Sequence, residues 1–230
     1  MSTLERPDRH VLPPLEAGQR LDQPTFHQRY EAMPDGTWAE LIGGEVVMPS
    51  PLFDDHGGSG ENVSLWLGLY RCFTPGLRGS ANATTILGTD SEVQPDHQLR
   101  LRPGKGGAAR VVGGYVHGPP ELVVEVSRSS KRIDLGRKKS DYERAGVVEY
   151  VVVEQEPDRV HWFVLREGRY AVKTADPDGV FRSDIFPGLW LDPQALFAED
   201  LDGLRATLER GLATPEHAAF VERLAGLPDD

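Results

Sequence analysis

Two apolar runs with a helical stretch between them constrain the fold of this chain more than any other feature. Residues 122–126 read Leu-Val-Val-Glu-Val and residues 149–153 read Glu-Tyr-Val-Val-Val, and such β-branched runs are typical of buried strands. Residues 134–145 have a helical pattern that ends at Gly146. Strand, helix and strand over about thirty residues form a crossover unit, which predicts two parallel neighbouring strands in an α/β domain.

An acidic residue inside the first run raises a question of charge. Glu125 lies within residues 122–126, and a buried carboxylate is costly unless it is paired. One interpretation is a salt bridge with a nearby arginine. The other is a divalent cation shared with Asp96, which follows Pro95, and supported by Lys138 on the next helix. The order Asp96, Glu125, Lys138 favours the second interpretation.

The remaining patterns predict further helices and hairpins around this unit. A short helix is expected over residues 25–33, and two short strands flank the glycine turn Gly43-Gly44. A longer helix carries an apolar stripe. A second hairpin is expected around the turn Glu167-Gly168. The stripe residues of the longer helix are Val63, Trp66, Leu67 and Tyr70.

Three segments are expected along the chain. Residues 1–22 are polar and predict a flexible tail, residues 23–198 predict the main domain, and residues 199–230 predict a helical extension. The leucines of residues 201–212 form one stripe. That stripe could mediate a homodimer or pack on its own domain, and the sequence leaves both alternatives open.

Composition limits the kinds of partner and compartment. No stretch of about 18 apolar residues is present, and the first residues lack the apolar centre of a signal peptide, so we expect a cytoplasmic protein without a membrane span. Cys72 is the only cysteine, which excludes an intrachain disulfide. The net charge of −11 argues against a protein that coats nucleic acid non-specifically.

A local reversal of charge follows Glu125. Residues 128–139 contain six basic residues and a single acid, Asp134. Next to a carboxylate pair, such a cluster is suited to nucleic-acid phosphates, although an ordinary basic helix start would look the same. The residues are Arg128, Lys131, Arg132, Arg137, Lys138 and Lys139.

Four blocks of sequence in a fixed order carry a resemblance to a known family. They are Glu40-Leu41-Ile42-Gly43-Gly44-Glu45, Gln94-Pro95-Asp96, Glu121-Leu122-Val123-Val124-Glu125-Val126 and Asp134-Leu135-Gly136-Arg137-Lys138-Lys139. Together they resemble the Uma2-like family of bacterial "putative restriction endonucleases" within the PD-(D/E)XK nuclease superfamily. The resemblance covers residues 25–197, most of the chain.

The resemblance implies a fold, a cofactor and roles for particular residues. It implies a restriction-endonuclease-like core, a mixed β-sheet flanked by helices, and a site for Mg²⁺ or Mn²⁺. Asp96 and Glu125 would be the metal carboxylates and catalytic residues, and Lys138 the catalytic lysine, because Ser127 stands two residues after the glutamate. Glu45 and His56 would belong to the first motif of the family's site, which precedes Asp96 in the sequence. Arg128, Lys131, Arg132, Arg137 and Lys139 would contact nucleic acid.

Two stretches depart from the family pattern. Residues 97–100 read His-Gln-Leu-Arg, which predicts a partly polar or frayed strand after Asp96. Residues 103–114 are rich in glycine and basic residues and predict a surface loop.

Two functions remain as hypotheses from the sequence. The first is a metal-dependent endonuclease acting on DNA. The second is a non-catalytic nucleic-acid or protein interaction module on a nuclease fold. RNA, or branched or modified DNA, is a further possible substrate, and the sequence does not distinguish these.

Overall fold

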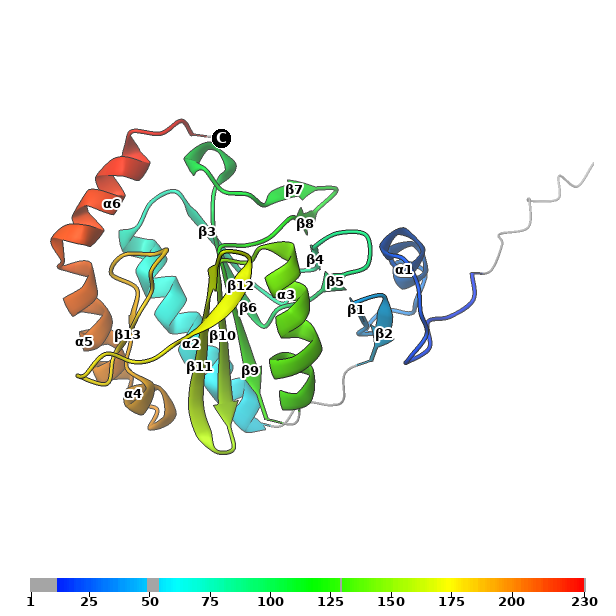
Figure 1. The fold of residues 1–230 in the computed structure, drawn as a ribbon, viewed down its shortest axis with the longest axis horizontal. Coiled ribbons are helices and arrows are strands. Elements are labelled where there is room, and N and C mark those ends of the chain that lie inside the picture. Colours follow the sequence, from blue (N-terminus) through cyan, green and yellow to red (C-terminus); the bar gives the residue numbers. More distant parts are fainter. Residues whose placement is uncertain (1–11, 49–53, 129, 230) are drawn as a thin grey trace, which may run out of the picture.

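Two six-stranded sheets with helices packed around them make up the fold (Figure 1). The computed structural model describes residues 12–48, 54–128 and 130–229, and for residues 54–58 it describes the backbone alone. A small two-stranded sheet, β13 (Phe181–Arg182) and β14 (Trp190–Leu191), accompanies them. The expected mixed α/β architecture with a helical C-terminal part is confirmed.

The first sheet contains the predicted crossover unit. Its strand order is β12-β11-β10-β9-β6-β3. β9 and β10 run parallel, with Val123 opposite Tyr150, as the sequence predicts, and the other pairs are antiparallel. The strands are β3 (Leu77–Ala81), β6 (His97–Leu101), β9 (Leu122–Ser127), β10 (Glu149–Gln155), β11 (Asp158–Arg166) and β12 (Arg169–Lys173).

Helices cover both faces of this sheet. Alternate residues of β9 point to opposite sides, so Val124 packs with α2 (Asp54–Phe73) and Val123 packs with the crossover helix. The crossover begins as a π-helix, η2 (Ile133–Lys138), and continues as α3 (Lys139–Ala145). Gly146 ends it with φ +90°, a left-handed conformation that glycine adopts without strain. Glu125 is on the same face of β9 as Val123, and it therefore points at η2 and α3.

The second sheet has the order β2-β1-β5-β4-β8-β7 and includes the predicted glycine hairpin. Ile42 pairs with Glu45 and Glu40 with Val47 across that hairpin. The strands are β1 (Glu40–Ile42), β2 (Glu45–Val47), β4 (Thr85–Ile86), β5 (Glu92–Val93), β7 (Arg110–Val112) and β8 (Tyr115–His117).

Two expectations about irregular segments are wrong. β6, expected to be partly polar or frayed, is polar but not frayed: it is buried along its whole length, because β3 and β9 pair with it on either side, and the Gln98 amide donates to the Thr85 hydroxyl of β4 at 3.0 Å. Residues 103–114, expected to be a surface loop, form the 3₁₀ turn η1 (Pro103–Lys105) and strand β7. The Lys105 ammonium is buried there because it donates to the Leu227 carbonyl at 2.7 Å.

The N-terminal segment packs along the hairpin. Residues 12–22, within the predicted tail, contain the buried Leu15, and the amide of Gly18 donates to the carbonyl of Val46 at 2.8 Å. Helix α1 (Gln23–Tyr30) then begins two residues earlier than expected, because Asp22 is its N-cap and accepts a hydrogen bond from the backbone amide of Thr25.

The C-terminal helices pack on the domain itself. Leu204 and Leu208 of α5 (Leu201–Leu212) and Phe220 of α6 (Pro215–Ala225) join the same core as α2. A short helix, α4 (Pro193–Phe197), precedes them. Leu204 and Leu208 of the stripe therefore pack on their own domain, whereas Leu201 is 47% exposed. Across the described ranges, no helix combines the length and apolar character needed to cross a membrane.

Candidate active site

Glu125 lies at the centre of a buried polar cluster between β9 and the crossover helix. Only 2% of the residue is exposed. Its Oε1 accepts hydrogen bonds from the Lys138 ammonium at 3.1 Å and the Tyr142 hydroxyl at 2.7 Å. Its Oε2 accepts a hydrogen bond from the backbone amide of Asp96 at 3.4 Å. The two oxygens thus have different surroundings: Oε1 is held by donors on the helix, and Oε2 faces Asp96.

Asp96 reaches the same cluster from the turn before β6. Its Oδ2 accepts a hydrogen bond from the backbone amide of Val126 at 2.7 Å. β6 and β9 are antiparallel, with His97 opposite Val124, so the start of β6 lies beside Glu125. Each acid is therefore hydrogen-bonded to the backbone of the other acid's segment, and the structure brings together Asp96, Glu125 and Lys138 as the sequence predicts.

Glu40 is a further acid of the cluster that the sequence interpretation missed. Its Oε1 lies 3.1 Å from the Lys138 ammonium and accepts the backbone amide of Gln94 at 2.6 Å. The interpretation placed Glu45 in this first motif instead. The hairpin register puts Glu40 and Glu45 on the same face, so the alternation of the strands indicated the face but not which acid meets the lysine.

Acidic groups outnumber basic ones in this cluster. Burial raises the pKa of Glu125 well above its usual value, Lys138 opposes the rise, and Asp96, Asp134 and Glu40 reinforce it. Burial by itself would lower the pKa of Lys138, but the four acids together raise it well above the usual range. Lys138 therefore remains an ammonium ion.

Asp134 completes the acidic surroundings one helical turn before Lys138. It is 3% exposed and accepts a hydrogen bond from the Ser130 hydroxyl at 2.5 Å. Burial raises its pKa above the usual value, while Lys138 and the serine hydrogen bonds lower it. Four carboxyl groups around one ammonium create a negative potential that an additional cation would relieve.

The donor set fits a hard, hydrated cation. Asp96 and Glu125 offer carboxylate oxygens from adjacent strands, and Mg²⁺ takes one or two carboxylates and keeps several waters. Within the described residues no group of three or more His, Cys, Asp or Glu side chains is arranged to hold a metal ion. His56 is part of α2, and its side chain is outside the described residues.

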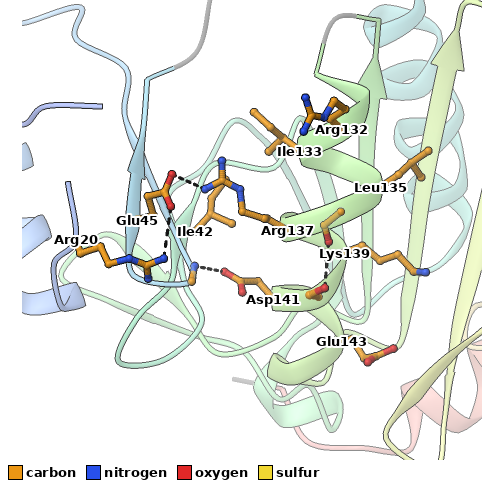
Figure 2. A pocket seen from close by; sticks show the side chains of 13 residues that line it. Arg20, Ile42, Glu45, Arg132, Ile133, Leu135, Arg137, Lys139, Asp141 and Glu143 are labelled. Atoms are coloured by element: carbon orange, nitrogen blue, oxygen red, sulfur yellow. Dashed lines mark hydrogen bonds and ion pairs between the residues drawn. The ribbon is translucent and has the colours of Figure 1, made fainter. Parts of the chain in front are cut away.

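Glu45 lies beside the glycine turn of the hairpin, on the same face as Glu40. Its carboxylate is 2.6 Å from Arg137 and 3.7 Å from Arg20, and it lines a pocket of about 840 Å³ between the hairpin and the outer face of the crossover helix (Figure 2). Arg137 and Lys138 are adjacent on the helix, so their side chains point in different directions: Lys138 contacts the acidic cluster and Arg137 contacts Glu45 in this pocket.

The structure divides the predicted nucleic-acid-binding residues into two groups. Arg128 pairs with Glu156 at 2.6 Å and Lys131 pairs with Glu154. The other three line the pocket, and the ammonium of Lys139 lies 4.2 Å from the centre of the Phe163 ring. The pocket-lining residues of the predicted set are Arg132, Arg137 and Lys139.

Comparisons with known proteins agree with this fold. A sequence model of the family described as "Uma2: Putative restriction endonuclease" matches residues 24–194. Among solved structures, a "putative nuclease belonging to DUF820" from Anabaena variabilis superposes with a TM-score of 0.59 at 13% sequence identity. The match covers 74% of this chain and 96% of that one. No protein with a curated description matches the chain.

Proposed function

The chain belongs to the Uma2 family of "putative restriction endonucleases", and we propose that it is a metal-dependent nuclease that hydrolyses phosphodiester bonds in DNA. The observation that carries the proposal is the contact of Glu125 with both Lys138 and the Asp96 segment. Two carboxylates and a lysine around one buried position match the needs of phosphodiester hydrolysis. The proposed cation is Mg²⁺ or Mn²⁺, held by Asp96 and Glu125.

Each side chain has a distinct role in this proposal. A bound divalent cation lowers the pKa of its water and neutralises charge on the leaving oxygen. Lys138, kept protonated by the surrounding acids, donates to the attacking water or to the phosphate oxygens and stabilises the charge that develops there. It cannot serve as a general base while it carries its proton. Tyr142 and Lys138 together fix Oε1 of Glu125, which leaves Oε2 directed towards Asp96.

The contacts of Glu40 and Glu45 change the roles that the family resemblance implies for the first motif. Glu40 contacts Lys138, and we assign to it the role of orienting the lysine. Glu45 pairs with Arg137 and Arg20, and we assign it no part in the hydrolysis. His56 as a ligand or base stays a prediction from the family resemblance. The basic residues of positions 128–139 are the proposed contacts to phosphate.

Plasmid cleavage tests the proposal. We expect Mg²⁺-dependent nicking or linearisation of supercoiled plasmid by the purified protein. The variants Asp96→Asn, Glu125→Gln and Lys138→Met should each lose about 10²-fold or more in rate, whereas Glu222→Gln, a change at an exposed acid, should cleave like the wild type. Cleavage that persists in Asp96→Asn, purified in parallel, contradicts the mechanism. RNA and branched DNA in the same assay test the choice of DNA.

Metal binding separates this function from a non-catalytic interaction module. Titration calorimetry with Mn²⁺ should detect binding to the wild type and not to Glu125→Gln, with circular dichroism confirming that both are folded. A folded wild type that binds neither Mn²⁺ nor Mg²⁺ at millimolar concentration would favour the interaction module.

A further inference from the structure

The pocket beside the crossover helix is rich in arginine. It measures about 840 Å³ and opens between the β1–β2 hairpin and residues 132–143 of the crossover helix. Arg20 comes from the segment before α1, and Arg132 and Arg137 come from the helix. In Figure 2, Arg20 and Arg137 point at Glu45 from opposite sides, while Lys139 extends along the other flank of the helix.

Two of the three acids that line the pocket are already engaged elsewhere. Asp141 is 4% exposed and accepts hydrogen bonds from the Gly43 amide at 2.7 Å and the Ser91 hydroxyl at 2.8 Å. Glu143 accepts from the Tyr170 amide at 2.6 Å and pairs with Arg169 at 3.0 Å. The acid that meets the arginines of the pocket is Glu45. In a chain with a net charge of −11, this is a site of locally positive charge.

The carboxylate of Glu45 is placed as a bound anion would be. Its Oε1 is 2.6 Å from Nη1 of Arg137 and its Oε2 is 3.7 Å from Nη2 of Arg20. The guanidinium fork recognises carboxylate and phosphate oxygens with the same geometry. The side chains of Arg20 and Arg137 are 76% and 49% exposed, so an incoming anion can reach both without disrupting the core.

We propose that this pocket is a phosphate-binding site for a nucleic-acid strand, in which a backbone phosphate takes the place of the Glu45 carboxylate between Arg137 and Arg20. Arg132 and Lys139 then contact neighbouring phosphates of the same strand. The identity of the ligand as nucleic acid rests on the proposed nuclease function. The site would hold the strand on the same helical turn that places Lys138 against Glu125, and Glu45 would act as a built-in competitor that weakens binding.

Binding can be measured without hydrolysis. The probe is a fluorescent twenty-nucleotide single-stranded DNA, titrated in EDTA against the Glu125→Gln protein, which is proposed to be cleavage-defective. Adding Glu45→Gln should tighten binding about five- to tenfold, because the competitor's charge is gone. Adding Arg137→Gln or Arg132→Gln should weaken binding and reduce its salt dependence, since each arginine neutralises a phosphate.

A matched substitution controls for net charge. Glu209→Gln removes the same charge and releases Arg205 from an ion pair of 2.6 Å, but outside the pocket and away from the proposed phosphate contacts; its effect should stay below about twofold. Equal effects of Glu45→Gln and Glu209→Gln would overturn the proposal, as would wild-type affinity in both arginine variants. Arg132 is exposed, so its variant remains informative if Arg137→Gln fails to fold.

Competition identifies the source of the phosphate. Unlabelled oligonucleotide should displace the probe at far lower concentration than inorganic phosphate or a mononucleotide does. Equal potency of inorganic phosphate would overturn the assignment to a strand. The result is separable from the nuclease proposal, because the pocket can pass this binding test while plasmid cleavage fails, or the reverse.

Discussion

Lys138 and Glu125 form an ion pair of 3.1 Å in the interior of the protein, with only 6% of the lysine exposed. A second acid, Glu40, lies at the same distance from the ammonium. Such a buried pair is weak evidence for net stabilisation, since both charges lose their hydration, but breaking it leaves uncompensated charge. The arrangement therefore makes a sharp prediction about stability.

Replacing the lysine should destabilise the fold in a way that metal can partly reverse. In Lys138→Met the acids lose their ammonium partner, and we expect the free energy of unfolding in EDTA to fall by about 3–5 kcal/mol, measured by urea denaturation. Mg²⁺ should then stabilise the variant more than it stabilises the wild type, because the cation replaces the missing positive charge. Lys131→Met, the loss of a half-exposed lysine, should cost less than about 1 kcal/mol. Equal losses in the two variants would contradict the prediction.

Tyr142 should matter to the orientation of Glu125 more than to the fold. Tyr142→Phe removes the hydroxyl that donates to Oε1 of Glu125 at 2.7 Å, and we expect a loss of about 1–2 kcal/mol in unfolding free energy. We also expect Mn²⁺ affinity to fall by about tenfold or more, as for other groups that orient a metal ligand. Both are measured on the same preparation, by denaturation and calorimetry.

Tyr170→Phe is the matched control. It also removes a tyrosine hydroxyl bond, to the carbonyl of Val147 at 3.0 Å, but away from Glu125. A similar loss of stability with unchanged Mn²⁺ affinity is expected. Equal weakening of Mn²⁺ binding in both variants would show that Tyr142 has no specific role at the site.

The elements that the sequence predicts well are those with a local periodic signal. The parallel pair β9–β10 follows from two β-branched runs and the helix between them, and the hairpin follows from Gly43-Gly44. In α2 the stripe residues Trp66 and Tyr70 are fully buried, as the spacing indicates.

What the sequence could not predict depends on contacts between distant segments. Burial of β6 requires Thr85 of the other sheet to accept from Gln98, and nothing near residue 98 indicates that partner. The choice between Glu40 and Glu45 likewise depends on where the crossover helix meets the hairpin. Lys138 meets one acid and Arg137 the other, although alternation places both acids on one face.

Glu149 should make the stability of the fold depend on pH. It is fully buried at the start of β10, and its carboxyl accepts from the Ser183 hydroxyl at 2.7 Å and the Asp184 amide at 2.6 Å. Burial raises its pKa to about 7, these hydrogen bonds lower it, and the nearby Asp184 charge adds to the rise. Tyr70 also faces it. The folded state therefore holds this proton more tightly than the unfolded state.

The sign of the pH effect follows from that difference. The stability associated with Glu149 is greatest below the ordinary glutamate pKa and is lost as the pH rises through about 7, a change of roughly 3 kcal/mol at most. In Glu149→Gln this loss between pH 5 and 8 should be largely absent in urea denaturation. Glu222→Gln, at an exposed acid, should keep the wild-type profile. Parallel profiles for wild type and Glu149→Gln would show that another group is responsible.

Gly211 tests whether the C-terminal helices and the nuclease-like core unfold together. A Cβ at this position of α5 would lie 2.3 Å from the carbonyl oxygen of Gly188 and 2.8 Å from the Trp190 ring. Backbone and a packed ring cannot move aside cheaply, so Gly211→Ala should cost about 2–3 kcal/mol in unfolding free energy. Gly68→Ala in α2, where nothing lies within 4 Å of the new Cβ, should instead gain up to about 1 kcal/mol from helix propensity.

The shape of the unfolding curve reports whether α5 and α6 unfold together with the core. Leu204, Leu208 and Phe220 share one core with Trp66 and Tyr70 of α2, so a single urea transition at lower midpoint is expected for Gly211→Ala. Circular dichroism and tryptophan fluorescence should follow the same curve. An early, separate transition that spares the tryptophan signal would mean that α5 and α6 unfold independently of the core.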